Sequence, residues 1–124
     1  MQQDKIKINF NGASETLLNP LRGRAELSKE HNSVLDDPKA MEIVEHIDYD
    51  FSKLDTKLNL ESNLVFTARA RQFDEKIRAY ITEHPHASVV NLGAGLDTTF
   101  YRVDNGSIHG TTLTFMMSLN SGNN

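Results

Sequence analysis

The longest periodic pattern in the chain covers residues 63–83, where apolar side chains recur at steps of three and four. This spacing predicts one long helix that Ser62 or Asn63 caps and that turns a single apolar stripe toward a core. The stripe comprises Phe66, Ala70, Phe73, Ile77, Tyr80 and Ile81. Two pairs spaced four apart, Arg71 with Glu75 and Asp74 with Arg78, are expected to add ~0.2–0.5 kcal/mol each on the exposed side.

A first upstream segment alternates apolar and polar residues over positions 1–10, which favours a short edge strand or an ordered tail. A helix is then predicted from a cap at Ser14 to about Leu27. Pro20 and Gly23 lie inside this segment, so we expect them to kink or divide the helix.

A second upstream helix has a clear start signal at Asp37 and Pro38. Asp37 can cap the exposed amides, and proline fits the first helical position without losing a hydrogen bond. The helix continues through a narrow apolar stripe of Met41, Val44 and Ile47. Residues 48–51 end it, and residues 53–60 are typical of a polar linker.

The only convincing strand follows Pro85, which disfavours helical geometry in the residue before it. Val89, Val90 and Leu92 suit a central parallel strand. This strand runs into a glycine turn and a polar segment that starts another helix. The order of a strand, a glycine turn and a helix predicts an α/β fold.

Composition narrows the function classes only a little. The 124 residues are 38% apolar and 24% charged, which is typical of one small soluble domain. The absence of cysteine excludes disulfides, zinc-thiolate sites and thiol nucleophiles. A net charge of -4 with interleaved basic residues does not favour nucleic acid as a partner. No run approaches the roughly 18 apolar residues of a membrane span, and no leader pattern is visible, so we expect a cytoplasmic protein.

The glycine turn carries the candidate chemistry. Gly93 and Gly95 lack the Cβ atoms that would block a nucleoside-type cofactor at the end of a strand. The same pair also occurs in ordinary tight turns, so the pattern alone leaves both readings open. A nicotinamide fingerprint requires a third glycine where this chain has Thr98. The turn therefore favours the looser Gly-x-Gly pattern of methyltransferases over that of dehydrogenases.

The run of residues 89–102, VVNLGAGLDTTFYR, resembles the first motif of the leucine carboxyl methyltransferase family, which includes polyketide O-methyltransferases. Three upstream segments resemble the same family in the same order: LRGRAE at 21–26, DPKA at 37–40 and ARARQFD at 68–74. The resemblance implies an N-terminal helical cap region (1–61) and the start of a class I, Rossmann-like methyltransferase domain (62–109). Its sheet is expected to be incomplete.

The resemblance also implies the cofactor and its site. S-adenosylmethionine would lie against Gly93, Gly95 and Asp97, and Arg69 would hold its carboxylate. An exposed arginine that pairs with a nearby acid is the alternative for Arg69. Arg24 is a second candidate for the carboxylate, with a solvated surface role as its alternative. Asp97 can also cap the helix that follows, and both of its roles can hold together.

Neither a catalytic residue nor a metal site is identified. His84 and His86 flank Pro85 in a loop with no third ligand near in sequence, which indicates a solvated loop. The methyl acceptor, a small molecule or a protein with a carboxyl or hydroxyl group, is not specified by any residue.

The last segment, residues 110–124, does not match the family's second strand. If the possible codons of this segment are read one base earlier, they can encode the family's second strand at nearly every position. The exception is a proline of the family, because the shifted reading of Met116 allows only His or Tyr. We therefore hypothesise a one-base deletion near His109 and Gly110, a non-native tail, and a truncated, inactive fragment with weak or partner-dependent folding. A short protein with a variable tail is the alternative to this hypothesis.

Two other function classes remain open from the sequence. One is a non-enzymatic module that self-associates through an exposed strand edge. The other is a nicotinamide-dependent oxidoreductase, which Thr98 disfavours.

Overall fold

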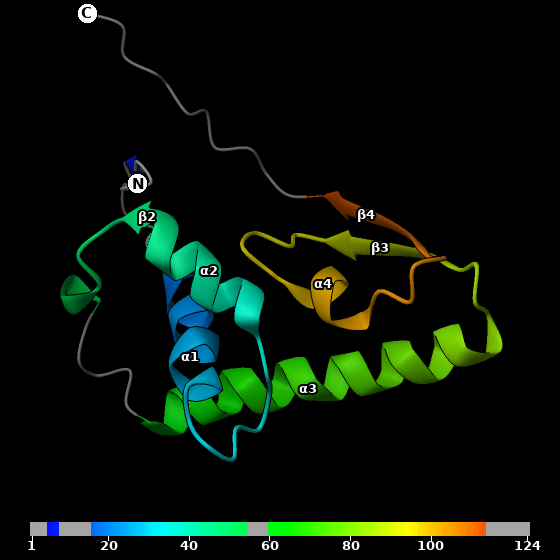
Figure 1. Ribbon diagram of the computed structural model, residues 1–124, viewed down its shortest axis with the longest axis horizontal. Helices are drawn as coiled ribbons and strands as arrows, with labels where there is room; N and C mark the ends of the chain where they lie inside the picture. The colour runs from blue at the N-terminus through cyan, green and yellow to red at the C-terminus, as the bar shows by residue number, and fades with distance from the viewer. Residues whose placement is uncertain (1–4, 8–15, 55–59, 114–124) are drawn as a thin grey trace, which may run out of the picture.

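The computed structural model describes residues 5–7, 16–54 and 60–113. Helix α3 (Leu60–Glu83) runs along the length of the molecule. Helices α1 (Leu18–Ser28) and α2 (Pro38–His46) lie over its first half (Figure 1). Over its second half lie helix α4 (Thr99–Val103) and a small sheet. This mixed α/β arrangement confirms the predicted fold class at the level of helices combined with parallel strands.

Helix α1 is continuous, so the predicted kink or division is wrong. Pro20 stands in the first helical turn, where its missing N–H removes no intrahelical bond. Gly23 is buried where α1 meets α3, and a Cβ there would come 2.8 Å from Oδ1 of Asn63. The predicted cap Ser14 lies outside the described residues.

Helix α2 begins as predicted, because Oδ1 of Asp37 accepts a hydrogen bond from the Ala40 amide at 3.0 Å and Pro38 follows the cap. The helix ends at His46, one residue before the predicted last stripe position. Strand β2 (Ile47–Asp48) follows and pairs in parallel with β1 (Ile6–Lys7). The predicted N-terminal edge strand is therefore confirmed at these two residues. A short 3-10 helix, η2 (Phe51–Lys53), comes next.

Helix α3 begins at Leu60, so Ser62 and Asn63 lie inside it and the predicted caps are wrong. The predicted core-facing stripe is also wrong in part, since Phe73 is 52% exposed and Tyr80 is 56% exposed. The buried residues of this helix are Thr67, Asp74 and Ile81. They repeat every seven positions on one face, where Arg102 of α4 binds Asp74 and the Thr67 hydroxyl donates to the Asn63 oxygen of the same helix.

The two predicted charge pairs on α3 have different outcomes. Arg71 donates to Glu75 at 2.9 Å, which confirms the first pair. The second pair is wrong: Asp74 binds Arg102, and Arg78 donates to the backbone oxygen of Arg102 at 2.8 Å. A buried arginine from another element offers Asp74 a stronger partner than an exposed neighbour on its own helix does.

Strand β3 (Ser88–Leu92) confirms the predicted strand, and β4 (His109–Leu113) pairs with it in parallel, with Ser88 opposite His109 and Leu92 opposite Leu113. The prediction of a single convincing strand is therefore wrong. Strand β4 has an apolar residue only at its end, so its pattern carries little strand signal. The predicted boundary between residues 109 and 110 falls inside this strand.

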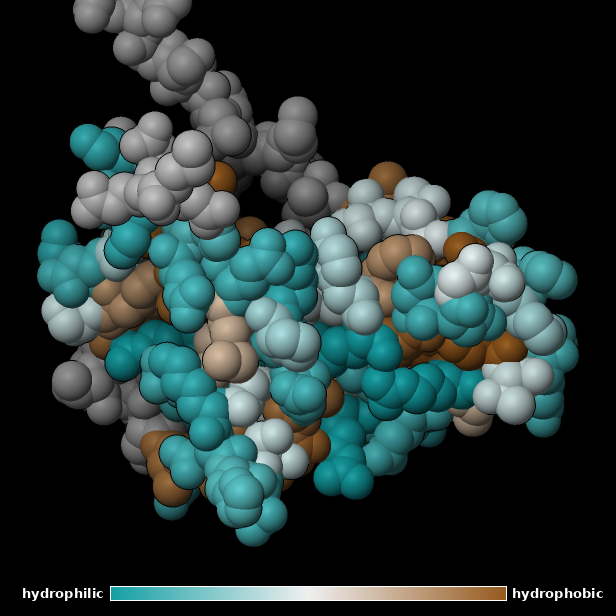
Figure 2. Space-filling view, in the orientation of Figure 1, coloured by the Kyte–Doolittle hydropathy of each residue, from teal (hydrophilic) through white to brown (hydrophobic). Residues whose placement is uncertain are grey.

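Two apolar clusters hold the described residues together. The larger joins α1, α2 and the segment after them through Leu18, Leu21, Ala25, Ala40, Ile47 and Leu54. The smaller joins α3, α4 and the residue before β4 through Ile81, Val103 and Ile108. On the face shown in Figure 2, hydrophobic residues gather between the second half of α3 and the sheet, with polar residues around them. Among the described helices, none combines the length and the apolar character that crossing a membrane requires.

Candidate functional site

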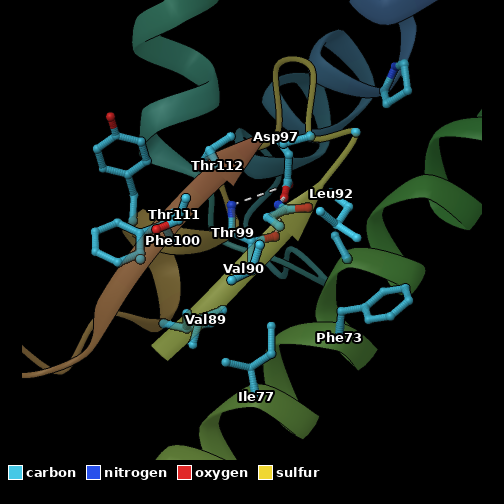
Figure 3. Close-up of a pocket in the computed structure, with 18 of the residues that line it drawn as sticks. Phe73, Ile77, Val89, Val90, Leu92, Asp97, Thr99, Phe100, Thr111 and Thr112 are labelled. Atoms are coloured by element: carbon cyan, nitrogen blue, oxygen red, sulfur yellow. Dashed lines mark hydrogen bonds between the residues drawn. The ribbon is translucent and has the colours of Figure 1, made fainter. Parts of the chain in front are cut away.

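A cleft of about 720 Å³ opens between α3, the two strands β3 and β4, and the glycine turn. Figure 3 shows Ile77 projecting from α3 toward Val89, and Asp97 lying beyond the carboxyl end of β3. Ligands of open α/β sheets bind outside the carboxyl ends of the strands. The cleft therefore lies where this class of fold places a cofactor.

The glycine turn needs its two glycines, because Gly93 has φ +64° and Gly95 has φ +53°. The Gly93 amide donates to the Leu113 oxygen at 2.7 Å, which joins the turn to the end of β4. A Cβ at Gly93 would meet nothing within 4 Å, so this residue leaves open space on the cleft. A Cβ at Gly95 would instead lie 3.2 Å from Leu17, and Gly95 is absent from the cleft lining.

Asp97 lies on the cleft and is held from two sides. Its Oδ2 accepts a short hydrogen bond from Nδ2 of Asn91, drawn as the dashed line in Figure 3. Its Oδ1 accepts from the amide and the hydroxyl of Thr99, at 3.3 and 3.0 Å. The side chain thus satisfies an amide at the start of α4, as its predicted capping role requires, and remains 25% exposed.

Arg69 lies exposed on α3 and lines the same cleft. Its guanidinium carbon lies 5.9 Å from the centre of the Phe73 ring, a distance that permits cation–π attraction. No acid among the described residues pairs with it. The alternative of a surface ion pair is therefore not observed among these residues.

Arg24 occupies a different environment, with only 6% of the residue exposed. Its Nε donates to Oδ2 of Asp37 at 3.0 Å, and its Nη2 donates to the Leu96 oxygen at 3.0 Å. The predicted alternative of a solvated surface arginine is therefore wrong. Although Arg24 borders the cleft, these two contacts hold its guanidinium against the protein.

The largest polar feature beside the cleft was not predicted from the sequence. Arg102 donates to Asp74 from Nε at 2.7 Å and from Nη2 at 3.1 Å, and to Asp37 from Nη1 at 2.7 Å. The Thr98 hydroxyl also donates to Asp37. We call Arg24, Asp37, Asp74, Thr98 and Arg102 the buried charge network. The contacts of its two aspartates within the network join residues 13 to 65 positions apart, so no local pattern could have indicated them.

Burial opposes the charged form of Arg102, but its hydrogen bond to Asp74 and the charges of Asp37, Asp74 and Asp97 outweigh this effect and raise the pKa of Arg102. The guanidinium therefore stays protonated throughout the physiological range. Two arginines and two aspartates compensate one another in the network.

The site can bind and orient a ligand, and its described residues contain no nucleophile–base pair. Within the described segments, no cluster of three or more His, Asp or Glu residues could hold a metal ion. The cleft combines open backbone at Gly93, an exposed cation at Arg69 and an apolar wall from α3. This combination suits a molecule with a carboxylate and a flat, partly apolar group.

The sequence profile of the leucine carboxyl methyltransferase family matches residues 19–114. The chain belongs to this family. It is 38% identical over 97 residues to the tetracenomycin polyketide synthesis O-methyltransferase TcmP of Streptomyces glaucescens, covering 78% of this chain and 35% of the relative. It is 32% identical over 108 residues to the S-adenosyl-L-methionine-dependent methyltransferase dpfgK of Gibberella zeae, covering 81% of this chain and 36% of the relative. No solved structure matches the chain.

The family resemblance seen in the sequence is confirmed by these matches, and S-adenosylmethionine is confirmed as a cofactor within the family by the name of the second relative. The chain spans only about a third of the length of either relative.

Proposed function

We propose that this chain belongs to an S-adenosylmethionine-dependent O-methyltransferase and that the cleft holds the cofactor. The observation that carries the proposal is the placement of Arg69 and Gly93 on one cleft at the carboxyl end of a parallel strand. The names of the two relatives, an O-methyltransferase and an S-adenosyl-L-methionine-dependent methyltransferase, support the same class of activity. The core would be a class I, Rossmann-like sheet of which β3 and β4 form part.

The residues present fit this cofactor. The cleft volume of about 720 Å³ lies within the usual range for small-ligand sites. Arg69 would bind the carboxylate, Gly93 would let the ligand approach the backbone, and Asp97 would accept hydrogen bonds from its polar groups. Gly95 would serve the site indirectly, by letting the turn pack against Leu17. Arg24 would act at the edge of the cleft.

When bound, the cofactor supplies an activated methyl group. Transfer of that group to a carboxylate or hydroxyl depends mainly on aligning the acceptor with it. The described residues would contribute by orienting the donor and excluding water from one side of it. The acceptor, a small molecule or a protein, is not indicated by any residue of the cleft.

Calorimetric titration with S-adenosylmethionine tests the proposal. Arg69→Met removes the charge-assisted hydrogen bond and should weaken binding by about ten- to a hundredfold, which corresponds to ~1.5–3 kcal/mol. Arg71→Met, two positions along the same helix and outside the cleft, is the matched control and should bind normally. The ligand 5′-methylthioadenosine has no carboxylate, so Arg69→Met should leave its affinity unchanged.

The opposite results would reject the proposal. Equal affinity of Arg69→Met and the unsubstituted chain for S-adenosylmethionine would exclude the assigned role of Arg69. Binding of NAD in place of S-adenosylmethionine would favour the oxidoreductase. Thr98 is fully buried and bonded to Asp37, so this position presents no glycine backbone to a nicotinamide dinucleotide.

We also propose that residues 110–124 are out of frame and that the chain binds cofactor without transferring the methyl group. The codon reading shifted by one base supports this. Sequencing the gene decides it, because methyltransferase sequence should resume in the shifted frame. If it does not, the tail is native.

The exposed side chains of Val90, Leu92 and Leu113 on the sheet favour a second candidate, a self-associating module without enzymatic activity. Its partner would be another copy of the chain.

A further inference from the structure

We propose that the buried charge network positions the glycine turn relative to α3, and that Arg102 is the positioning residue at its centre. This inference rests on the proposed function, since it concerns how the two halves of the cofactor site are held together. Arg69 on α3 forms one half, and Gly93 with Asp97 on the turn forms the other.

Arg102 is linked to α3 through Asp74. Arg102 binds both carboxylate oxygens of Asp74 through Nε and Nη2, at 2.7 and 3.1 Å. A two-point contact of this kind fixes the orientation of the guanidinium plane as well as its distance. Asp74 lies on the same rigid helix as Arg69, so the position of Arg102 is set relative to Arg69.

Arg102 is also linked to the end of the glycine turn. Nη1 of Arg102 donates to the Thr98 hydroxyl, and Nη2 donates to Oγ1 of Thr99 at 3.1 Å. From the other side, Arg24 binds the Leu96 oxygen at 3.0 Å. Leu96 and Thr98, on the two sides of Asp97, are therefore held by arginines of α1 and α4.

The N-terminal helices join the network through Asp37. Oδ2 of Asp37 accepts from Arg24, Thr98 and Arg102, while its Oδ1 caps α2 at Ala40. The start of α2, the body of α1 and the turn thus share a single carboxylate. Movement of the turn away from Asp37 would leave that carboxylate with fewer partners in a buried place.

Burial explains why this arrangement is specific. The side chains of Asp37 and Asp74 are 0% exposed, and those of Arg102 and Arg24 are 4% and 7% exposed. Charge pairs buried to this degree contribute little net stability compared with apolar packing, yet they are costly to break. Their effect is therefore to select one geometry of the turn.

Because binding equilibria are reciprocal, a ligand that requires this geometry should also order the network. A ligand that contacts both halves of the site gains from the fixed spacing. S-adenosylmethionine would touch both Arg69 and the turn, whereas 5′-methylthioadenosine lacks the carboxylate and would touch the turn alone.

Calorimetry and amide hydrogen exchange on the full chain test the inference, with the variants Arg102→Met and Thr98→Val. Thr98→Val removes only the hydroxyl and keeps all four charges, so it serves if Arg102→Met does not fold. Arg71→Met is the control. We expect the affinity for S-adenosylmethionine to fall about 5- to 150-fold, the usual range for coupled sites. The affinity for 5′-methylthioadenosine should fall less.

Hydrogen exchange gives a second measurement that needs no ligand. Exchange should rise at the Asp97 amide, which bonds to the Ala94 oxygen in the turn, while amides within α3 stay protected. Equal acceleration along α3 and the turn, or an equal loss of affinity for both ligands, would overturn the inference by showing general destabilisation. Unchanged exchange at Asp97 in a folded variant would overturn it as well. Failure of the unsubstituted chain to bind S-adenosylmethionine would instead reject the proposed function, and the exchange data would still decide the role of Arg102.

Discussion

The contact between Phe100 and Gly110 shows how a single residue constrains the cleft. The Phe100 ring covers the α-carbon of Gly110 so closely that an added Cβ would overlap the ring atoms Cδ2 and Cε2. Both residues border the cleft. Any larger side chain at this position, including the Trp that the shifted codon reading permits, requires Phe100 to move.

Gly110→Ala should therefore destabilise the chain by about 1–3 kcal/mol, the usual cost of overpacking. Urea unfolding followed by circular dichroism measures the change. Phe100→Ala removes the ring and therefore the steric conflict. The double variant Phe100→Ala/Gly110→Ala should then lose little more unfolding free energy than Phe100→Ala alone. A full additive cost in the double variant would show that the ring is not the cause.

Glu42 on α2 provides a prediction about pH. Its carboxylate accepts a hydrogen bond from Nζ of Lys39 at 2.8 Å, and this bond lowers the pKa of Glu42 below its ordinary value. A lowered folded-state pKa means that the stabilisation is present above the unfolded-state pKa and is lost as the pH falls through the folded-state value. NMR titration of the Glu42 carboxyl should show the lowered pKa, and Lys39→Gln should raise it. An unchanged midpoint in that variant would contradict the assignment.

At the scale of helices and strands, local signals were sufficient where the cause is local. Asp37 and Pro38 predicted the start of α2, and the apolar run ending at Leu92 predicted β3. Strand β4 was missed because its stability comes from backbone pairing with β3, which leaves no apolar pattern. The exposed stripe of α3 was misassigned because its burial depends on what packs against it.

The candidate site shows the same division between local and distant causes. Motif resemblance predicted Arg69, Gly93 and Asp97, and the structure brings these three together on one cleft. Arg102 lies within the recognised motif, but its partners Asp37 and Asp74 come from distant elements. Such a network can be found only after the chain is folded.

The packing of α1 against α2 leads to a prediction about stability. Leu21 is fully buried in the larger apolar cluster, so Leu21→Ala should reduce the free energy of unfolding by about 2–5 kcal/mol. Leu64→Ala is the comparison, because Leu64 is 39% exposed on α3 and should cost much less. Chemical denaturation measures both variants. Similar losses in the two would show that the cluster between α1 and α2 is not the main core.

At the scale of the whole molecule, the sheet of β3 and β4 exposes apolar side chains. Among the described residues it pairs only β3 with β4, and Val90, Leu92 and Leu113 are more than half exposed. Exposed apolar strands with open edges are common sites of association between chains.

We therefore expect concentration-dependent self-association in sedimentation velocity experiments. Leu92→Lys should shift the chain toward monomer, because a charge on the exposed strand opposes both burial and edge pairing. Leu64→Lys on α3 serves as the control for added charge and should associate normally. Monomeric behaviour of the unsubstituted chain over the accessible concentrations would reject the prediction.

The seven-residue spacing of Thr67, Asp74 and Ile81 on α3 also limits how this chain can change in length. An α-helix turns by about 100° per residue. Inserting one residue between Arg69 and Asp74 would therefore rotate Arg69 away from the cleft or Asp74 away from Arg102. Insertions in the loop between α4 and β4 would not change the rotation of Arg69 relative to Asp74 around the helix axis. Changes in chain length should therefore be tolerated in such loops and excluded from the helical segment between Arg69 and Asp74.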